Sequence, residues 1–373
     1  MDFNLTETQE MFKKVAADFV KAQVPAHQMT QWYKNKQTYQ PQLVKKAAEL
    51  GWLGMMLPEP YGGAEVSATD CAVVFEELGR GPVPGPLFTS GVLSAQMILE
   101  AGTEEQRKRL LPSLCRGESI VVPAITDKAA YWGPEAVETR LSKTPHGYLL
   151  NGAKRFVLDA QAATSFLCAA RTEEGKVVFL VVDAKSSGIA VTPHVGFLVS
   201  VAEVRFEGVE VSPENLLGTS GANWATFETA LDKALPILCA YQVGASQEVF
   251  DMTCEYTRTR VVFGQPIGRF QRVQDHCVEI SIHLDAARWA TYETLWRIDS
   301  GMPARAAVHE AKAVASDGYY HATNYAHMVW AGPGTDYSHP MMAHSVLAHT
   351  LYQYLGTPGH HKRLMMDALY PRG

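Results

Sequence analysis

Two short runs in this sequence combine residue types suited to phosphate binding and to proton transfer. The first starts at Arg260 and reads Arg-Val-Val-Phe-Gly-Gln-Pro-Ile-Gly, with Gln271 shortly after it. A guanidinium is always charged and presents a planar fork of donors, so Arg260 suits a pyrophosphate; the alternative is a solvated charge at a helix end. The second run is Tyr354-Leu355-Gly356-Thr357, followed by His360 and His361. Imidazole titrates near neutral pH, so these histidines are either candidate general bases or solvated and capping side chains.

The charge and composition exclude several classes of protein. A formal net charge of −6 and a pI near 6.1 argue against a nucleic-acid surface, which is normally basic. No long uncharged apolar stretch is present, so no membrane span is predicted. The first residues read Met-Asp-Phe-Asn-Leu-Thr-Glu and lack the apolar region of a signal peptide, and the six cysteines form no Cys-x-x-Cys pair. We therefore predict a cytoplasmic protein with reduced thiols and no metal site.

Hydrophobic spacing divides the chain into a helical, a β-rich and a second helical segment. Thr103 and Gln106 have the spacing of a capping box at a helix start. Asn151-Gly152 and Glu174-Gly175 are typical of turns between short strands. Apolar runs predict strands near residues 120–122, 148–150, 166–170, 177–182 and 202–206, and helices over 226–256, 272–300, 304–330 and 344–355. The predicted fold is a multi-domain α+β protein: an N-terminal α-helical domain (1–118), a middle antiparallel β-barrel or sandwich (119–222) and a C-terminal four-helix bundle (223–373).

Four runs, in order along essentially the whole chain, resemble those of the acyl-CoA dehydrogenase family. They are Pro58-Glu59-Pro60-Tyr61-Gly62-Gly63, the run Leu150-Asn151-Gly152-Ala153-Lys154-Arg155-Phe156, the Arg260 run and the Tyr354 loop. The resemblance implies an FAD enzyme that dehydrogenates an acyl-CoA thioester between Cα and Cβ, with hydride transfer to flavin N5. It also implies an electron-transferring flavoprotein as electron acceptor.

The resemblance implies roles for particular residues. Thr126 matches the residue that hydrogen-bonds the pyrimidine side of the flavin, and Phe156 stands where the family usually has a stacking Trp. Arg260 matches an Arg that reaches the pyrophosphate from a neighbouring subunit, with Phe263 near the adenosine. The remaining implied contacts are Gln271 and Thr357 to FAD, and Asp232 and Tyr354 to the CoA substrate. If the chain has its own acyl pocket, Trp132, Phe88 and Phe156 are candidates to line it.

The resemblance fails where the family has its catalytic base. Leu355 stands in place of the Glu that removes the α-proton, and Leu has no lone pair to accept one. Ala234 stands at the position that carries the Glu in other members. Further departures affect CoA and FAD contacts: Leu235 replaces an Arg, Leu158 a hydroxyl residue, Met328 and Gly359 each a Gln, and Ala331 the first Gly of a pair.

Three hypotheses follow from these departures. The chain is one subunit of a heterotetramer (α2β2) whose homologous partner supplies the base, as in bacterial assemblies acting on steroid side chains and other bulky thioesters. Alternatively it is a homo-oligomer (a homotetramer) with a displaced base, acting on an alicyclic or aromatic-derived acyl-CoA. The third hypothesis is a non-catalytic scaffold or CoA-ligand-binding subunit. Candidates for a displaced base are Asp232, Glu228, Asp336, His339, His360 and His361.

Overall fold

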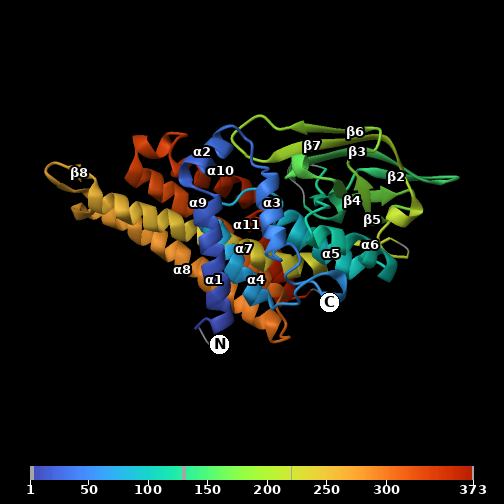
Figure 1. Ribbon diagram of the computed structural model, residues 1–373, viewed down its shortest axis with the longest axis horizontal. Coiled ribbons are helices and arrows are strands. Elements are labelled where there is room, and N and C mark those ends of the chain that lie inside the picture. Colours follow the sequence, from blue (N-terminus) through green and yellow to red (C-terminus); the bar gives the residue numbers. More distant parts are fainter. Residues whose placement is uncertain (1–3, 128–131, 220, 372–373) are drawn as a thin grey trace. The chain divides into compact units, whose positions relative to one another are not determined.

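The computed structural model describes residues 4–127, 132–219 and 221–371 (Figure 1). The chain divides into two compact units. The helical unit comprises Met1–Gln37, Ser67–Val83 and Leu235–Gly373; the mixed unit comprises Thr38–Val66 and Pro84–Ala234. No helix of the described residues is long and apolar enough to cross a membrane. All six cysteines are free thiols, and the described residues contain no cluster of three or more His, Cys, Asp or Glu side chains arranged to hold a metal.

The helical unit is built from long helices whose small residues permit close packing. Its core joins Cys239 and Val243 of α7 to Leu284 of α8 and Ala311 of α9. The helices α8 and α9 run side by side, with the β8–β9 hairpin projecting from the start of α8 (Figure 1). Its elements are α1 (Glu7–Gln23), α2 (Ala26–Lys34), α4 (Ala68–Arg80), the part of α7 (Trp224–Thr259) from residue 235, β8 (Val261–Val262), β9 (Gln265–Pro266), α8 (Gln271–Asp299), α9 (Arg305–Trp330), α10 (Pro340–Gln353) and α11 (Pro358–Leu369).

Two glycines bring α4 and α7 into backbone contact. A Cβ built on Gly79 would lie 1.9 Å from the carbonyl oxygen of Tyr241, and one built on Gly244 would lie 1.7 Å from that of Glu76. No real side chain tolerates these distances, so only glycine fits at either position. This close contact sets the position of α7 relative to α4 in the helical unit.

The mixed unit combines short helices with one seven-stranded sheet. Its helical elements are α3 (Pro41–Glu49), a π-helical turn at Thr89–Ser94, α5 (Ala95–Ala101) and α6 (Glu104–Cys115), which the predicted Thr103–Gln106 capping box starts. The strands are β1 (Val121–Ala124), β2 (Arg140–Thr144), β3 (Gly147–Leu158), β4 (Ser165–Thr172), β5 (Val177–Asp183), β6 (Ile189–Pro193) and β7 (Val201–Val211). Their order is β1-β4-β2-β3-β7-β6, with β5 paired to β4.

The α–β–α fold class is confirmed, but the sheet is mixed rather than wholly antiparallel. Strands β1 and β2 both pair with β4 in parallel. Parallel neighbours require crossover connections, which short-range turn signals do not reveal. The prediction of a turn at Asn151-Gly152 is also wrong, because these residues form an irregularity inside β3. There Gly152 allows close approach to Thr139, whereas the turn at Glu174-Gly175 is confirmed by a hydrogen bond from the Gly175 N–H to the Thr172 carbonyl.

Candidate functional site

In the mixed unit, Thr126 is held in place by a buried ion pair. Lys154 Nζ lies 2.8 Å from Asp127 Oδ2 and also donates to the Ile125 carbonyl at 3.1 Å. Both side chains are almost fully buried. The Arg155 N–H donates to the Thr126 carbonyl at 2.7 Å. Thr126, half-buried just after β1, is therefore fixed against the C-terminal half of β3.

Phe156 forms an exposed aromatic platform at the end of β3. The register of β3 shifts between Lys154 and Val157, and Phe156 adopts a left-handed backbone with φ of 55°. Phe156 is 39% exposed, and its ring stacks on the ring of His194, with centroids 5.0 Å apart. A left-handed backbone is rare for an aromatic residue and is usually retained for a functional reason. A partly exposed aromatic ring of this kind is suited to stacking on a flat aromatic ligand.

Asp159, which the sequence did not single out, lies just beyond this platform. Its carboxylate accepts hydrogen bonds from Thr89 Oγ1 and Ser200 Oγ, both at 2.9 Å. Burial raises the pKa of Asp159 to about 6, although the two hydroxyl donors act in the opposite direction. Ser200 also accepts a hydrogen bond from Thr38 Oγ1 at 2.6 Å. The network joins four chain segments around the end of β3.

The remaining site candidates of the mixed unit are Asp232 and Ala234, which lie on α7, and two aromatic residues, Trp132 and Phe88. Asp232 is half-buried and Ala234 is fully buried. Trp132 packs edge-on against Trp224, with centroids 6.2 Å apart, and 6.4 Å from Phe227. Trp132 is therefore part of an aromatic cluster of this unit, and Phe88 is buried at 8% exposure.

In the helical unit, the Arg260 run forms an exposed hairpin. Phe263 stands at its tip in a left-handed backbone with 91% of its surface exposed, and its ring meets that of Phe270 edge-on. Arg260 precedes β8, and Gln271 opens α8; both are exposed. Within the described part of the chain, the Arg260 side chain has no ion pair. The fold thus brings these three predicted residues to one end of α8.

The Tyr354 loop connects α10 to α11. Leu355 has a left-handed backbone with φ of 62°, and its side chain is 3% exposed. Thr357 is exposed and caps α11, because its Oγ1 accepts a hydrogen bond from the His360 N–H. Ala331, at the end of α9, has φ of 53° and ψ of −132°, a conformation that suits the glycine the family has there.

Most candidates for a displaced base are already engaged. Glu228 accepts a hydrogen bond from Trp224 Nε1, and Asp336 accepts one from the Ser338 N–H, which lowers the pKa of Asp336. His339 caps α10 through Nδ1. Both ring nitrogens of His361 are hydrogen-bonded within a fully buried environment. The other two, Asp232 and His360, are half-buried and also have interaction partners.

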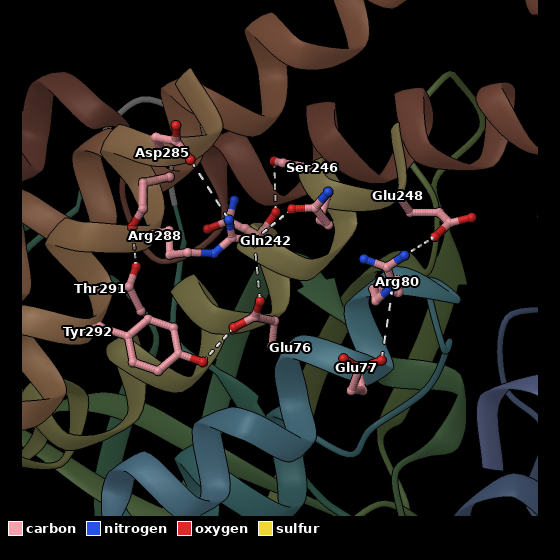
Figure 2. Close-up of polar contacts among 12 residues, drawn as sticks. Glu76, Glu77, Arg80, Gln242, Ser246, Glu248, Asp285, Arg288, Thr291 and Tyr292 are labelled. Carbon is pink, nitrogen blue, oxygen red and sulfur yellow. Dashed lines mark hydrogen bonds and ion pairs between the residues drawn. The ribbon is translucent and has the colours of Figure 1, made fainter. Parts of the chain in front are cut away.

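A separate charged network joins α4, α7 and α8 of the helical unit (Figure 2). Arg80 pairs with Glu248 at 3.1 Å and with Asp251 at 2.7 Å. Glu76 accepts a hydrogen bond from Tyr292 Oη at 2.6 Å and pairs with Arg288 at 3.5 Å. Because these groups hold the helices beside the Gly79–Gly244 crossing, we interpret the network as structural.

The residues present fit an aromatic cofactor that carries phosphate groups. In the mixed unit, Phe156 offers a stacking face; in the helical unit, Arg260 is an exposed cation without an ion pair among the described residues, and Thr357 caps the N-terminus of a helix, where anions are stabilised. The features of the two units, taken separately, are of the class found in proteins that bind a nucleotide cofactor.

Comparisons with known proteins agree with this class. Models of the N-terminal and C-terminal domains of acyl-CoA dehydrogenase match residues 6–118 and 221–370. A probable acyl-CoA dehydrogenase of Bacillus subtilis, YngJ, is 29% identical over 345 residues, 90% of each chain. A chain of the ChsE4-ChsE5 complex of Mycobacterium tuberculosis is 26% identical with a TM-score of 0.89, and PigA, solved with FAD and proline, is 25% identical with a TM-score of 0.91. Both structural matches cover 100% of each chain.

The chain belongs to the acyl-CoA dehydrogenase family of flavin-dependent oxidoreductases, and FAD is the cofactor.

Proposed function

We propose that this chain is the subunit of a hetero-oligomeric acyl-CoA dehydrogenase that lacks the base, and that a homologous subunit supplies the Glu. The observation that carries this proposal is the side chain of Leu355, which is aliphatic and buried where the family has its proton acceptor. Ala234, at the second base position, is fully buried as well. General-base catalysis needs an acceptor within hydrogen-bond reach of the proton, and neither side chain is one.

The reaction of the assembly is the α,β-dehydrogenation of an acyl-CoA thioester. The base of the partner takes the α-proton, the β-hydrogen leaves with its electron pair as hydride, and a double bond forms between the two carbons. FAD, when bound, supplies the hydride acceptor, and an electron-transferring flavoprotein removes the electrons. Phe156 of this chain would stack on a flavin, and Arg260 would reach the pyrophosphate of a flavin bound by a neighbouring subunit. Thr357 would contact FAD, and Asp232 would contact CoA.

An exposed apolar face of α8 supports oligomer formation. Val278 and Ile282 are each 56% exposed, Trp289 is 48% and Trp296 is 37% exposed. Their spacing of four and then seven residues places them on one side of the helix. The β8–β9 hairpin projects from the start of α8 (Figure 1). Phe263 lies between its two strands and adds a further exposed ring. Several exposed apolar side chains on one side of a helix favour a protein interface there. The similarity to a chain of the ChsE4-ChsE5 complex favours a homologous chain as the partner.

The decisive experiment compares the chain alone with the chain co-expressed with a homologue that has Glu at either base position. Oligomer mass, flavin absorbance and release of C2 deuterium from labelled acyl-CoA thioesters would be measured for both samples. We expect deuterium release and flavin bleaching only in the mixed assembly. A matched control is the same assembly with the partner's Glu replaced by Gln, in which both signals should be lost.

The alternatives predict different outcomes. Bleaching of flavin in the lone chain by an acyl-CoA would contradict the proposal and support a homo-oligomer with a displaced base. A mixed assembly that keeps full activity when Arg260 of this chain becomes Ala would support a scaffold role instead. The acyl group need not be known in advance, because each sample is tested with a panel of thioesters that ranges from butyryl-CoA to bulky acyl-CoA compounds.

A further inference from the structure

A buried imidazole pair lies beneath the Tyr354 loop. His361 of α11 is fully buried, and its Nε2 lies 3.0 Å from the carbonyl oxygen of Leu355. Its Nδ1 lies 3.1 Å from Nδ1 of His309, a residue of α9 with 2% exposure. The two histidines are 52 positions apart in the sequence, so tertiary packing alone brings them together.

Elementary hydrogen-bond chemistry fixes where the protons lie. A carbonyl oxygen only accepts, so Nε2 of His361 carries a proton. Burial, followed by the charge of Lys312, lowers the pKa of His361 to about 2, and the ring is therefore neutral with a bare Nδ1. That nitrogen accepts, so Nδ1 of His309 must donate. Burial and the nearby charges of Arg305 and His360 lower the pKa of His309 to about 4, so this ring is neutral as well.

Lys312 holds the end of α10 next to the imidazole pair. Its Nζ donates to the Leu351 carbonyl at 3.1 Å and to Ser316 Oγ at 2.7 Å, and the side chain is fully buried. Leu351 lies in the last turn of α10, where the helix dipole favours a cation. Burial lowers the pKa of Lys312 to about 8, so the group is still largely charged at neutral pH. A charged Lys312 disfavours a second cation on His361.

The loop above these groups adopts a conformation that needs support. A left-handed backbone costs about 1–2 kcal/mol for a residue such as Leu. Leu355 nevertheless has φ of 62°. Gly356 follows with φ of 109°, and a Cβ there would lie 2.9 Å from His361 Nε2. The rings of His360, whose Cδ2 would lie 2.8 Å from that Cβ, and of His361 together fill the space under Gly356. His361 supplies the only donor that the structure gives to the Leu355 carbonyl within the described residues.

We propose that His361 is a positioning residue: its Nε2–H holds residue 355 in the left-handed backbone, and His309 keeps that proton on Nε2. That position 355 matters for catalysis rests on the proposed function. The proton positions on the two histidines and the geometry of the loop do not depend on it. His361 is therefore not a displaced base. The backbone of the loop therefore orients the side chain at position 355 in one direction, although that side chain is Leu and not Glu in this protein.

Nitrogen NMR of the whole protein labelled with 15N-histidine tests the proton positions. We expect His361 to carry its proton on Nε2 and His309 on Nδ1, with no titration between pH 5.5 and pH 8. Signals are assigned by their loss in His361→Gln and His309→Gln. The opposite tautomers, or titration of either ring in this range, would overturn the proposal.

Hydrogen exchange of the loop tests the positioning role. His361→Phe keeps a ring but loses the donor, and we expect amide exchange at residues 354–357 to rise about tenfold, the factor expected for one net hydrogen bond. His361→Gln restores a donor and should rescue most of the effect. The matched control is His344→Phe, because His344 is equally buried in the same unit and bonds Tyr319 Oη at 3.0 Å.

The control should lower thermal stability without changing loop exchange. Equal loop exchange in wild type and His361→Phe would refute the positioning role. If His361→Phe fails to fold, the nitrogen NMR spectra of the wild type and of His361→Gln still test the proposed proton positions. None of these measurements involves acyl-CoA, so their failure would leave the base-lacking subunit proposal standing, and failure of that proposal would leave these results intact.

Discussion

Asp159 and Ser200 hold each other through two hydrogen bonds of opposite direction. The Asp159 N–H donates to the Ser200 carbonyl at 2.7 Å, and Ser200 Oγ donates to Asp159 Oδ1 at 2.9 Å. Both residues have left-handed backbones, with φ of 61° and 59°. Non-glycine residues in this region persist only where the surroundings over-determine them. The pair therefore fixes the segment that immediately follows the Phe156 platform.

Replacing Asp159 by Asn should change how stability depends on pH. The folded-state pKa of about 6 is above the ordinary value of 3.8, so the protonated form is favoured in the folded protein. The contribution of Asp159 to the free energy of unfolding is fully present below pH 4 and is lost as the pH rises through 6. The full loss is about 3 kcal/mol, and about 1.4 kcal/mol of it falls between pH 5 and pH 8.

Asn does not ionise, so the thermal midpoint of Asp159→Asn should rise relative to wild type as the pH increases from 5 to 8. Asp183→Asn, which changes an exposed carboxylate in the same unit, is the control and should follow the wild-type profile. Parallel curves for wild type and Asp159→Asn would show that the Asp159 carboxyl does not titrate in this way.

Leu355→Glu should restore a proton acceptor to the Tyr354 loop. We expect release of C2 deuterium from an acyl-CoA substrate to rise at least ~100-fold over wild type, the lower range for a general base. Thermal stability should fall, because a carboxylate replaces a side chain that is 3% exposed. Leu355→Gln has similar size and polarity but is no base, so it should lose stability without gaining exchange. Equal exchange in both variants would contradict the assignment of position 355.

Arg260→Ala should weaken flavin retention by the assembled oligomer. A charge-assisted hydrogen bond contributes about 1.5–3 kcal/mol, so the dissociation constant of FAD should rise roughly 10- to 100-fold, measured by flavin fluorescence. Arg260→Lys should give an intermediate value, because Lys lacks the planar fork. The control is Arg258→Ala, which removes an exposed cation that pairs with Glu255 at 3.6 Å. Comparable losses in both alanine variants would indicate a general charge effect.

Gly244→Ala should force α4 and α7 apart. Its Cβ would lie 1.7 Å from the Glu76 carbonyl oxygen, which is backbone and cannot move alone. Overpacking of this kind costs about 1–3 kcal/mol or more, read as a lower thermal midpoint. Gly318→Ala is the matched helical control, because its nearest neighbour, the His283 carbonyl oxygen, would lie 3.0 Å away and needs only a small shift. If Gly244→Ala lowered the thermal midpoint less than Gly318→Ala does, the close backbone contact between α4 and α7 would be disproved.

Local sequence patterns predicted the helices well because their signals are short-range. The Thr103–Gln106 capping box starts α6, and the predicted helix over 272–300 agrees with α8 to within one residue at each end. The Tyr354 loop and the Arg260 run also revealed the family, because each is a contiguous stretch. In contrast, the prediction of a turn at Asn151-Gly152 is wrong, because a turn and a β-bulge favour the same residue types.

The sequence by itself determined the order of helical and β segments, the family and the absence of Glu at position 355. Only the tertiary structure decided the parallel pairing of β1 with β4, the burial of Lys154 against Asp127 and the contact of His309 with His361. The physical reason is that each of these depends on residues tens of positions apart, which local propensity does not encode. Leu355 appears in the sequence as a missing base, but its left-handed backbone and its bond to His361 exist only in the folded chain.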